Sequence, residues 1–248
     1  MPGRSSRPAR APRRATHSRA QIVDTAIAVL DAHGVRGLTL RGLAAELGGG
    51  LGSIYWYVSG KDELLELACD ELIGRALDAA DTEERLVPSP PMEVDLGTDD
   101  EAVLDAVRSL RRVGLALFDQ MARHPWLAAQ AQLGGAERSN GLRVWESMGR
   151  PLAAMGLTER QQFHGSTALT GYVVGVAAEM SLQDRAADPD LPKGEQLDLV
   201  VERWQSPDYD DFPWIRSMTE QFRGHDDIVQ FAAGLDLLLL GLVRQGQG

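Results

Sequence analysis

The sequence has a single cysteine, Cys69, among 248 residues. One cysteine excludes a disulfide framework within the chain and favours a reducing cytosol. The sequence also lacks any run of about 18 apolar residues, the length that a membrane-spanning helix requires. Its arginine-rich N-terminus has no apolar stretch of about 7 to 15 residues, which a secretory signal would need. These absences predict a cytoplasmic protein that is neither exported nor inserted into a membrane.

Residue patterns typical of catalysis or metal binding are missing as well. There is no glycine-rich phosphate loop, no His-Glu-x-x-His and no Glu-x-x-His pair, and Cys69 has no histidine partner at a suggestive spacing. The histidines are scattered, which argues against a zinc cluster: His17, His33, His124, His164 and His225. We therefore predict no catalytic residue, no metal site and no cofactor.

Charge is distributed unevenly along the chain. The net charge is −11, yet residues 1–61 carry eight arginines and one lysine against three acidic residues, which gives +6 for this part and −17 for the rest. A basic end can bind phosphate while an acidic body stays clear of nucleic acid. Residues 1–17 hold five arginines and little to bury, so we expect a disordered basic arm. This arm either has no role or reaches a neighbouring minor groove or backbone.

Apolar residues recur at helical spacing along the rest of the chain, and no convincing period-two alternation appears, so the predicted fold class is all-α. Ser18 can cap a first helix that His33-Gly34 closes, and Ser59-x-x-Asp62 resembles a capping box. Two short helices lie between, and Thr82–Asp99 reads as a surface loop. The other helices are expected at about 59–81, 100–123, from 125, 136–155, 158–185, 197–204 and 226–244. This organisation predicts an N-terminal domain over residues 18–62 and a larger helical domain over 63–248.

Residues 38–61 are the most informative stretch. Leucines and Ala44 form one apolar stripe with Thr39 as its N-cap, and a run of glycines from Gly48 ends this short helix. Three aromatic residues, Tyr55, Trp56 and Tyr57, then follow in a row. At about 100° per residue no single core can bury all three rings, so at least one must face outward. Two short helices around a tight turn are typical of a helix-turn-helix that reads DNA.

Residues 18–61 resemble the N-terminal domain of the TetR family of bacterial regulators, through the blocks Gly37–Ala44, Ile54–Val58 and Gly60-Lys61. The resemblance implies that a helix from about Leu51 to Tyr57 enters the major groove while the helix starting at Thr39 braces it. Arg41 is then a candidate for guanine, and Ile54 and Val58 face the core. The other implied DNA contacts are Thr39 at the start of the bracing helix, Leu51 and Gly52 at base edges, Ser53, Trp56, Tyr57 and Lys61 on phosphates, and Tyr55 on a thymine methyl or a phosphate.

Two observations leave parts of this interface open. Tyr55 and Tyr57 could simply pack the small domain. Gly49, Gly50 and Gly52 stand where the family more often has other residues. Because each glycine inside a helix costs about 1 kcal/mol relative to alanine, the recognition helix is expected to be loosely ordered until DNA is bound.

The last predicted helix is apolar nearly all round, so it must be covered on several sides. Gly171 and Gly175 in the preceding long helix, and Gly234 and Gly241 in this one, have spacings that allow close helix approach. A single-chain core explains these features as simply as a dimer does. The family resemblance implies a homodimer that pairs through the two long C-terminal helices, and late residues resemble tetracycline-repressor-like members.

Several residues of the larger domain could line a cavity for a small organic molecule, although packing in the core explains any one of them more simply. Apolar side chains and aromatic ones with polar tips are typical of such a lining. The candidate ligand-binding residues are Cys69, Trp126, Trp145, Met148, His164, Thr167 and Tyr172.

Together these features predict a dimeric, ligand-responsive repressor that binds a palindromic operator in double-stranded DNA and responds to an unidentified small organic effector. The alternatives are a small-molecule-binding or catalytic helical bundle that has lost DNA reading, and an architectural DNA binder that responds to no ligand.

Overall fold

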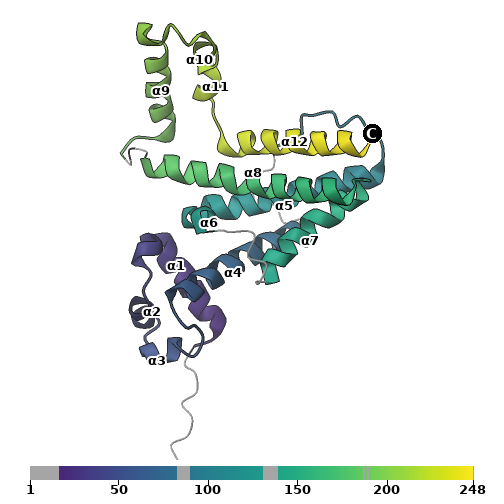
Figure 1. Cartoon of the computed structure of the whole chain (residues 1–248). Helices are drawn as coiled ribbons and strands as arrows, with labels where there is room; N and C mark the ends of the chain where they lie inside the picture. The colour runs from purple at the N-terminus through teal and green to yellow at the C-terminus, as the bar shows by residue number, and fades with distance from the viewer. Residues whose placement is uncertain (1–16, 83–89, 131–138, 187, 189, 248) are drawn as a thin grey trace, which may run out of the picture. The chain divides into compact units, whose positions relative to one another are not determined.

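The computed structural model describes residues 17–82, 90–130, 139–186, 188 and 190–247, and it places no strand in them. The predicted arm, except for His17, and residues 83–89 of the predicted loop lie outside these ranges. Figure 1 shows the helices, whose bounds in chain order are α1 Arg19–Gly37, α2 Leu40–Glu46, α3 Leu51–Ile54, α4 Lys61–Asp81, α5 Glu101–Arg123, α6 Pro125–Gln130, α7 Ser139–Ala154, α8 Glu159–Ala186, α9 Lys193–Trp204, the 3-10 helix η1 Pro207–Tyr209, α10 Pro213–Ser217, α11 Thr219–Arg223 and α12 Asp227–Gly246.

The chain divides into two compact units, residues 1–68 and 69–248. The division falls inside α4, six residues after the predicted domain boundary at residue 62. None of the described helices has the length and apolar character needed to cross a bilayer.

The first unit is built on α1, whose start and end are both set by local sequence. The Ser18 hydroxyl accepts from the Gln21 amide and the Gln21 side chain accepts from the Ser18 amide, so a full capping box begins the helix. Gly34 has φ +64° and interrupts the helical path, where His33-Gly34 was expected to close it, although helical turns resume as far as Gly37. One face of α1 is buried with residues of the two following helices: Ile22, Ala26, Leu30, Leu43 and Ile54.

The start of α4 differs from its predicted capping box. Both the amide and the hydroxyl of Ser59 donate to the Glu63 carboxylate at 2.7 Å. The prediction that Asp62 fills this role was wrong, because the longer glutamate one residue further on reaches back to Ser59.

The second unit is a bundle in which α5 packs against α7, α8 and α12, and α8 packs against α6, α7 and α12. Figure 1 shows α12 lying along α8. Three aromatic rings join these helices: Phe118 of α5 stacks on Phe231 of α12 at a centroid distance of 3.8 Å, and Tyr172 of α8 stacks on Phe231 at 5.2 Å. The Tyr172 hydroxyl donates to the Phe231 carbonyl at 3.0 Å. Gly234 lies beneath that hydroxyl, where a Cβ would collide with it.

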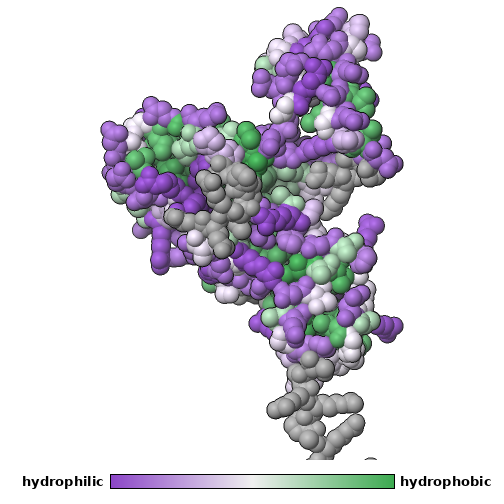
Figure 2. All heavy atoms as spheres, turned by 180° about the vertical axis from the view of Figure 1, so that it is seen from behind, coloured by the Kyte–Doolittle hydropathy of each residue, from purple (hydrophilic) through white to green (hydrophobic). Residues whose placement is uncertain are grey.

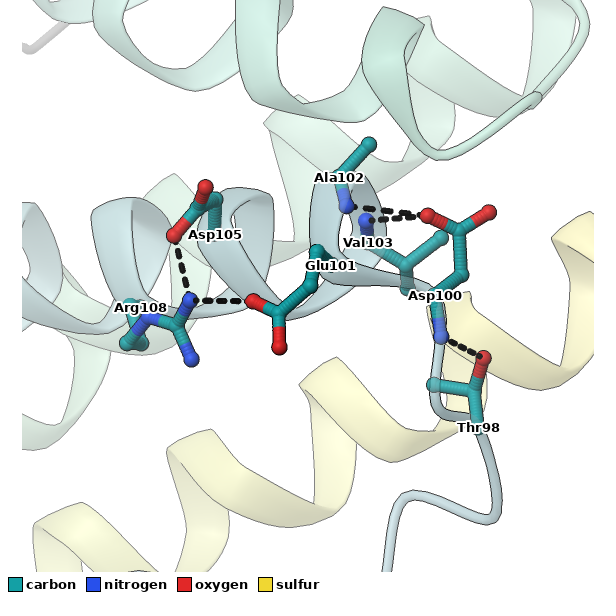
Figure 3. Close-up of polar contacts among 7 residues, drawn as sticks. All are labelled: Thr98, Asp100, Glu101, Ala102, Val103, Asp105 and Arg108. Atoms are coloured by element: carbon teal, nitrogen blue, oxygen red, sulfur yellow. Dashed lines mark hydrogen bonds and ion pairs between the residues drawn. The ribbon is translucent and has the colours of Figure 1, made fainter.

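The N-terminus of α5 is capped by an acidic residue close to the predicted start of this helix (Figure 3). The Asp100 carboxylate accepts from the amides of Ala102 at 2.9 Å and Val103 at 3.5 Å, satisfying two donors that the first helical turn leaves unpaired. Eight residues after Asp100, Arg108 binds Glu101 at 3.3 Å and also contacts Asp105. These charges are solvent-exposed, so they mark the polar face of α5 and add little stability.

Between α8 and α12 the chain forms a projecting group of short helices, α9 to α11, clearly separate from the bundle in Figure 1. The sequence predicts only part of α9; η1, α10 and α11 were missed because they are too short to show a helical period. Trp204 and Phe222 meet edge to face, and Gln205 donates to Thr219 at 2.7 Å, which holds α9 against α11. Figure 2 shows hydrophobic atoms at the surface of this group, where Leu199, Phe212 and Trp214 are exposed.

Candidate DNA-binding interface

A helix-turn-helix is formed by α2, the turn at Gly48 and α3. Thr39 caps α2, since its hydroxyl accepts from the Gly42 amide at 3.0 Å. Gly48 has φ +64°, a left-handed conformation that favours glycine and that ends α2. Leu43 and Ala44 are buried, so one face of α2 belongs to the core of the unit.

The second helix of this motif is shorter than predicted. α3 spans Leu51–Ile54 and residues 55–57 continue it as a turn, so the predicted helix as far as Tyr57 was wrong. Within the turn the Tyr57 amide donates to the Ile54 carbonyl at 2.9 Å, a tight three-residue spacing. Gly50 at the N-cap supplies no side chain to hold the helix start, and Gly52 lowers helix propensity inside it.

The aromatic run divides between surface and core. Trp56 is 85% exposed and Tyr55 is 56% exposed, while Ile54 and Val58, on either side of the run, are buried. The predictions that at least one ring faces outward and that Ile54 and Val58 face the core are confirmed. The two exposed rings are therefore accessible both to a flat base and to an extended sugar-phosphate backbone.

Tyr57 is tied to the start of the chain. Its half-buried hydroxyl donates to the carbonyl of His17 at 2.7 Å. This hydrogen bond links residues 40 apart, and no spacing rule in the sequence could have found it.

The remaining candidates for DNA contact differ in how free their polar groups are. Thr39, Arg41 and Gly52 are exposed, whereas Leu51, Ser53 and Lys61 are half-buried. The Ser53 hydroxyl donates to the Gly50 carbonyl at 2.6 Å. The Lys61 ammonium donates to the Val35 carbonyl at 2.7 Å, near the end of α1. Because an ammonium has three N–H donors, Lys61 can hold this carbonyl and a phosphate together.

The predicted ligand-binding residues do not share one environment. Cys69, Trp126 and Met148 are buried, and Trp145 and Tyr172 are half-buried. His164 and Thr167, in contrast, lie on the exposed face of α8, and the Thr167 hydroxyl donates to carbonyls of its own helix, at Phe163 and His164. These two residues therefore do not belong to the core that buries Trp126 and Met148. Among the described residues, no group of His, Cys, Asp and Glu side chains is arranged to hold a metal.

Two buried charged sites in the second unit were missed by sequence reasoning. Asp236 of α12 binds Arg111 of α5 through both oxygens, at 2.7 Å to Nε and 3.2 Å to Nη2, and Arg111 also donates to the Pro90 carbonyl at 2.7 Å. Asp119 is buried on α5 and pairs with Arg123 at 2.8 Å. The four-residue spacing of Asp119 and Arg123 can be detected in the sequence, but the burial of the carboxylate cannot.

Replacing Asp119 with asparagine is expected to raise the midpoint of thermal unfolding at pH 7. Burial raises the pKa of the Asp119 carboxyl, and the charge of Arg123 opposes this shift only in part. The pKa of Asp119 is therefore higher in the folded protein than in the unfolded chain. Its contribution to stability is fully present below the unfolded-state pKa and is lost as pH rises through the folded-state pKa. The gain of the Asp119→Asn variant should therefore disappear at about pH 3, below the ordinary Asp value. A gain that persists there would show that charge is not its cause.

Segments of both units match families of known proteins. Residues 22–68 match the family described as "Bacterial regulatory proteins, tetR family", and residues 100–245 match the "Tetracyclin repressor-like, C-terminal domain". An HTH-type transcriptional repressor from Streptomyces coeruleorubidus is 32% identical over 245 residues, which cover 95% of this chain and 80% of the relative. An HTH-type transcriptional regulator from Saccharopolyspora erythraea is 36% identical over 160 residues, 64% of this chain and 59% of that protein.

Solved structures agree with this assignment. A TetR transcriptional regulator from Streptomyces coelicolor is 34% identical, with a TM-score of 0.73 over 92% of this chain and 99% of the other. The TetR family protein ActR from the same organism, solved in complex with actinorhodin, shares the fold at 23% identity and a TM-score of 0.68, over 94% of this chain and 99% of ActR. The chain therefore belongs to the TetR family of transcriptional regulators.

Proposed function

We propose that this regulator is a homodimeric repressor that binds a palindromic operator and is released by a small organic effector. The main support for DNA binding is that Trp56 and Tyr55 are exposed directly after α3, while the flanking residues Ile54 and Val58 are buried. In this arrangement the core fixes the backbone of the motif, and the rings and the exposed Arg41 remain available for DNA.

The C-terminal helices support the homodimer. Exposed residues of α8 recur every three or four positions and include Phe163, Gly171 and Gly175, so they form one stripe along the helix. On α12 the same spacing exposes Ala233, Leu237 and Gly241. A second copy packed on these stripes would cover large apolar side chains, and a two-fold dimer suits an operator whose half-sites are about 34–36 Å apart.

An effector site in the bundle is supported by the buried and half-buried candidates Trp126, Trp145, Met148, Tyr172 and Cys69. The same fold holds actinorhodin in ActR. We infer an aromatic, largely apolar effector. Thermal-shift screening with such compounds should raise the unfolding midpoint, because a ligand that binds the folded state stabilises it by mass action. An architectural DNA binder without a ligand site would show no shift with any of them.

The operator can be identified by sequencing genomic DNA of the source organism that the purified protein retains at moderate salt. We expect a few sites with an inverted repeat, and a gel shift on each that exceeds binding to random DNA of equal length. No preference over random DNA would overturn the proposed function and favour a helical bundle that has lost DNA reading.

Arg41→Ala is expected to weaken operator binding by about 1–3 kcal/mol if its guanidinium takes O6 and N7 of a guanine. The preference for that base pair should be lost with it, which binding to operators substituted at each position would measure. Arg150→Ala is a matched control, since Arg150 is an exposed arginine of α7 paired with Glu146. Equal losses on every substituted operator would instead assign Arg41 to a phosphate.

A further inference from the structure

His17, the residue immediately before the N-cap of α1, contacts both ends of the recognition segment, by which we mean residues 49–57. At the far end, its carbonyl accepts from the Tyr57 hydroxyl at 2.7 Å. At the near end, its imidazole lies against Gly49, where a Cβ would stand 3.0 Å from Nε2 and 3.5 Å from Cδ2 of the ring. Because α3 spans Leu51–Ile54, these two contacts lie on either side of it.

The recognition segment has little internal structure to hold it in place. α3 has only four residues, and its N-cap Gly50 forms no side-chain hydrogen bond. Gly52 lowers the helix propensity further, and the Tyr55 amide reaches the Leu51 carbonyl at a long 3.4 Å. Helices this short are unstable on their own in water. Contacts from outside the segment must therefore supply much of its order.

The start of α1 does not depend on the contacts of His17. Ser18 and Gln21 form a complete capping box, and the Ile22 amide donates to the Ser18 carbonyl at 3.1 Å. Nε2 of His17 is buried and has no hydrogen-bond partner among the described residues. Since an unpaired buried nitrogen costs free energy, capping of α1 does not explain why the imidazole lies here.

The glycines before α3 differ in what requires them. Gly48 has φ +64°, a left-handed conformation that favours glycine, but Gly49 is not among the described glycines with positive φ. What a side chain at Gly49 would meet is the imidazole of His17 and, at 3.3 Å, the hydroxyl of Ser53. The absence of a Cβ at Gly49 thus makes room for His17 against the recognition segment.

We propose that His17 is a positioning residue that braces the recognition segment at both ends, through Gly49 and Tyr57, so that Tyr55 and Trp56 are presented to DNA on an ordered backbone. This inference rests on the proposed DNA-binding function. It gives Tyr57 a different role from the direct phosphate contact expected from the sequence. Since only the ordered segment binds, loosening the brace lowers affinity by the fraction of ordered segment that is lost.

The first test needs no DNA. Hydrogen exchange is measured residue by residue in the full chain, in Tyr57→Phe and in His17→Ala. Tyr57→Phe should speed exchange of the amides of residues 53–58 by about 2–10-fold, the equivalent of one net hydrogen bond, and His17→Ala should act in the same direction. Exchange in α1 should not change, because its capping box remains. Unchanged exchange at residues 53–58, or equally faster exchange throughout α1, would overturn the proposal.

The second test is a double-mutant cycle of Tyr57→Phe and His17→Ala on the recovered operator. Each single change should weaken binding by up to about 2–10-fold at each half-site. The double variant should lose less than the product of the two single effects, because both changes break the same brace. Two effects that multiply would mean that Tyr57 acts independently of His17, as a direct phosphate contact would, and would overturn the proposal.

The matched control is His225→Ala. His225 is a half-buried histidine of the second unit that pairs with Asp227 at 2.9 Å, so its loss should leave both operator affinity and exchange at residues 53–58 unchanged. Circular dichroism checks that each variant remains folded. A full chain with no operator preference would refute the proposed function, whereas the exchange measurements would still decide whether His17 braces the segment.

Discussion

Replacing Asp236 with alanine is expected to lower the free energy of unfolding by about 3–5 kcal/mol, because Arg111 would keep its buried position without a carboxylate to balance its charge. Both side chains are nearly inaccessible, at 12% and 3% exposed, and the two-oxygen geometry gives the pair two parallel hydrogen bonds. Urea unfolding followed by circular dichroism measures the change.

Two further variants separate burial from charge. Glu146→Ala breaks the exposed pair with Arg150 and should change stability by less than about 0.5 kcal/mol. The double change Arg111→Met and Asp236→Leu should recover most of the loss, since a buried ion pair can be exchanged for apolar side chains at little cost. If Asp236→Ala were as mild as Glu146→Ala, the pair would contribute nothing to the fold.

Leu237→Glu is expected to turn the regulator into a folded monomer and to reduce operator affinity by about 10²–10⁴-fold, the range typical when two linked binding sites become independent. Leu237 is 63% exposed on α12, so a charge there leaves the core of one chain intact. In a dimer packed on this stripe, the same charge would be buried without a partner. Light scattering gives the mass, and gel shift gives the affinity.

Leu142→Glu is the matched control, because Leu142 is a leucine of similar exposure on α7, outside the α8 and α12 stripes. It should leave both mass and affinity unchanged. A dimer that survives Leu237→Glu would move the interface elsewhere, and the projecting group of α9 to α11, with Phe212 and Trp214 exposed, would be the next surface to mutate.

Features set by neighbouring residues were predictable from the sequence. The caps at Ser18 and Thr39 follow from side-chain chemistry at a helix start, and the burial of Ile54 and Val58 was implied by the resemblance to the family. The length of α3 was overestimated because the aromatic run that marks the family was read as helix, whereas Gly50 and Gly52 leave the segment with a weak start and low propensity.

Features set by distant residues were not predictable. The Tyr57 to His17 hydrogen bond spans 40 residues and the Arg111 to Asp236 pair spans 125, and neither leaves a periodic trace in the sequence. The ligand candidates show the same limit. His164 and Thr167 were grouped with Trp126 by composition, but α8 turns them to its exposed face.

Gly234 has a consequence for the tolerance of this chain to random mutation. Every substitution of Gly234 adds a Cβ where the Tyr172 hydroxyl already lies. Variants substituted at this position should therefore be depleted in any library selected only for soluble expression. Gly171, Gly175 and Gly241 have open space around them in the single chain. Substitutions of these three glycines should survive selection for soluble expression and be depleted only when the library is selected for repression. A mutational scan under both selections would therefore separate glycines needed for folding of one chain from those needed for the dimer interface.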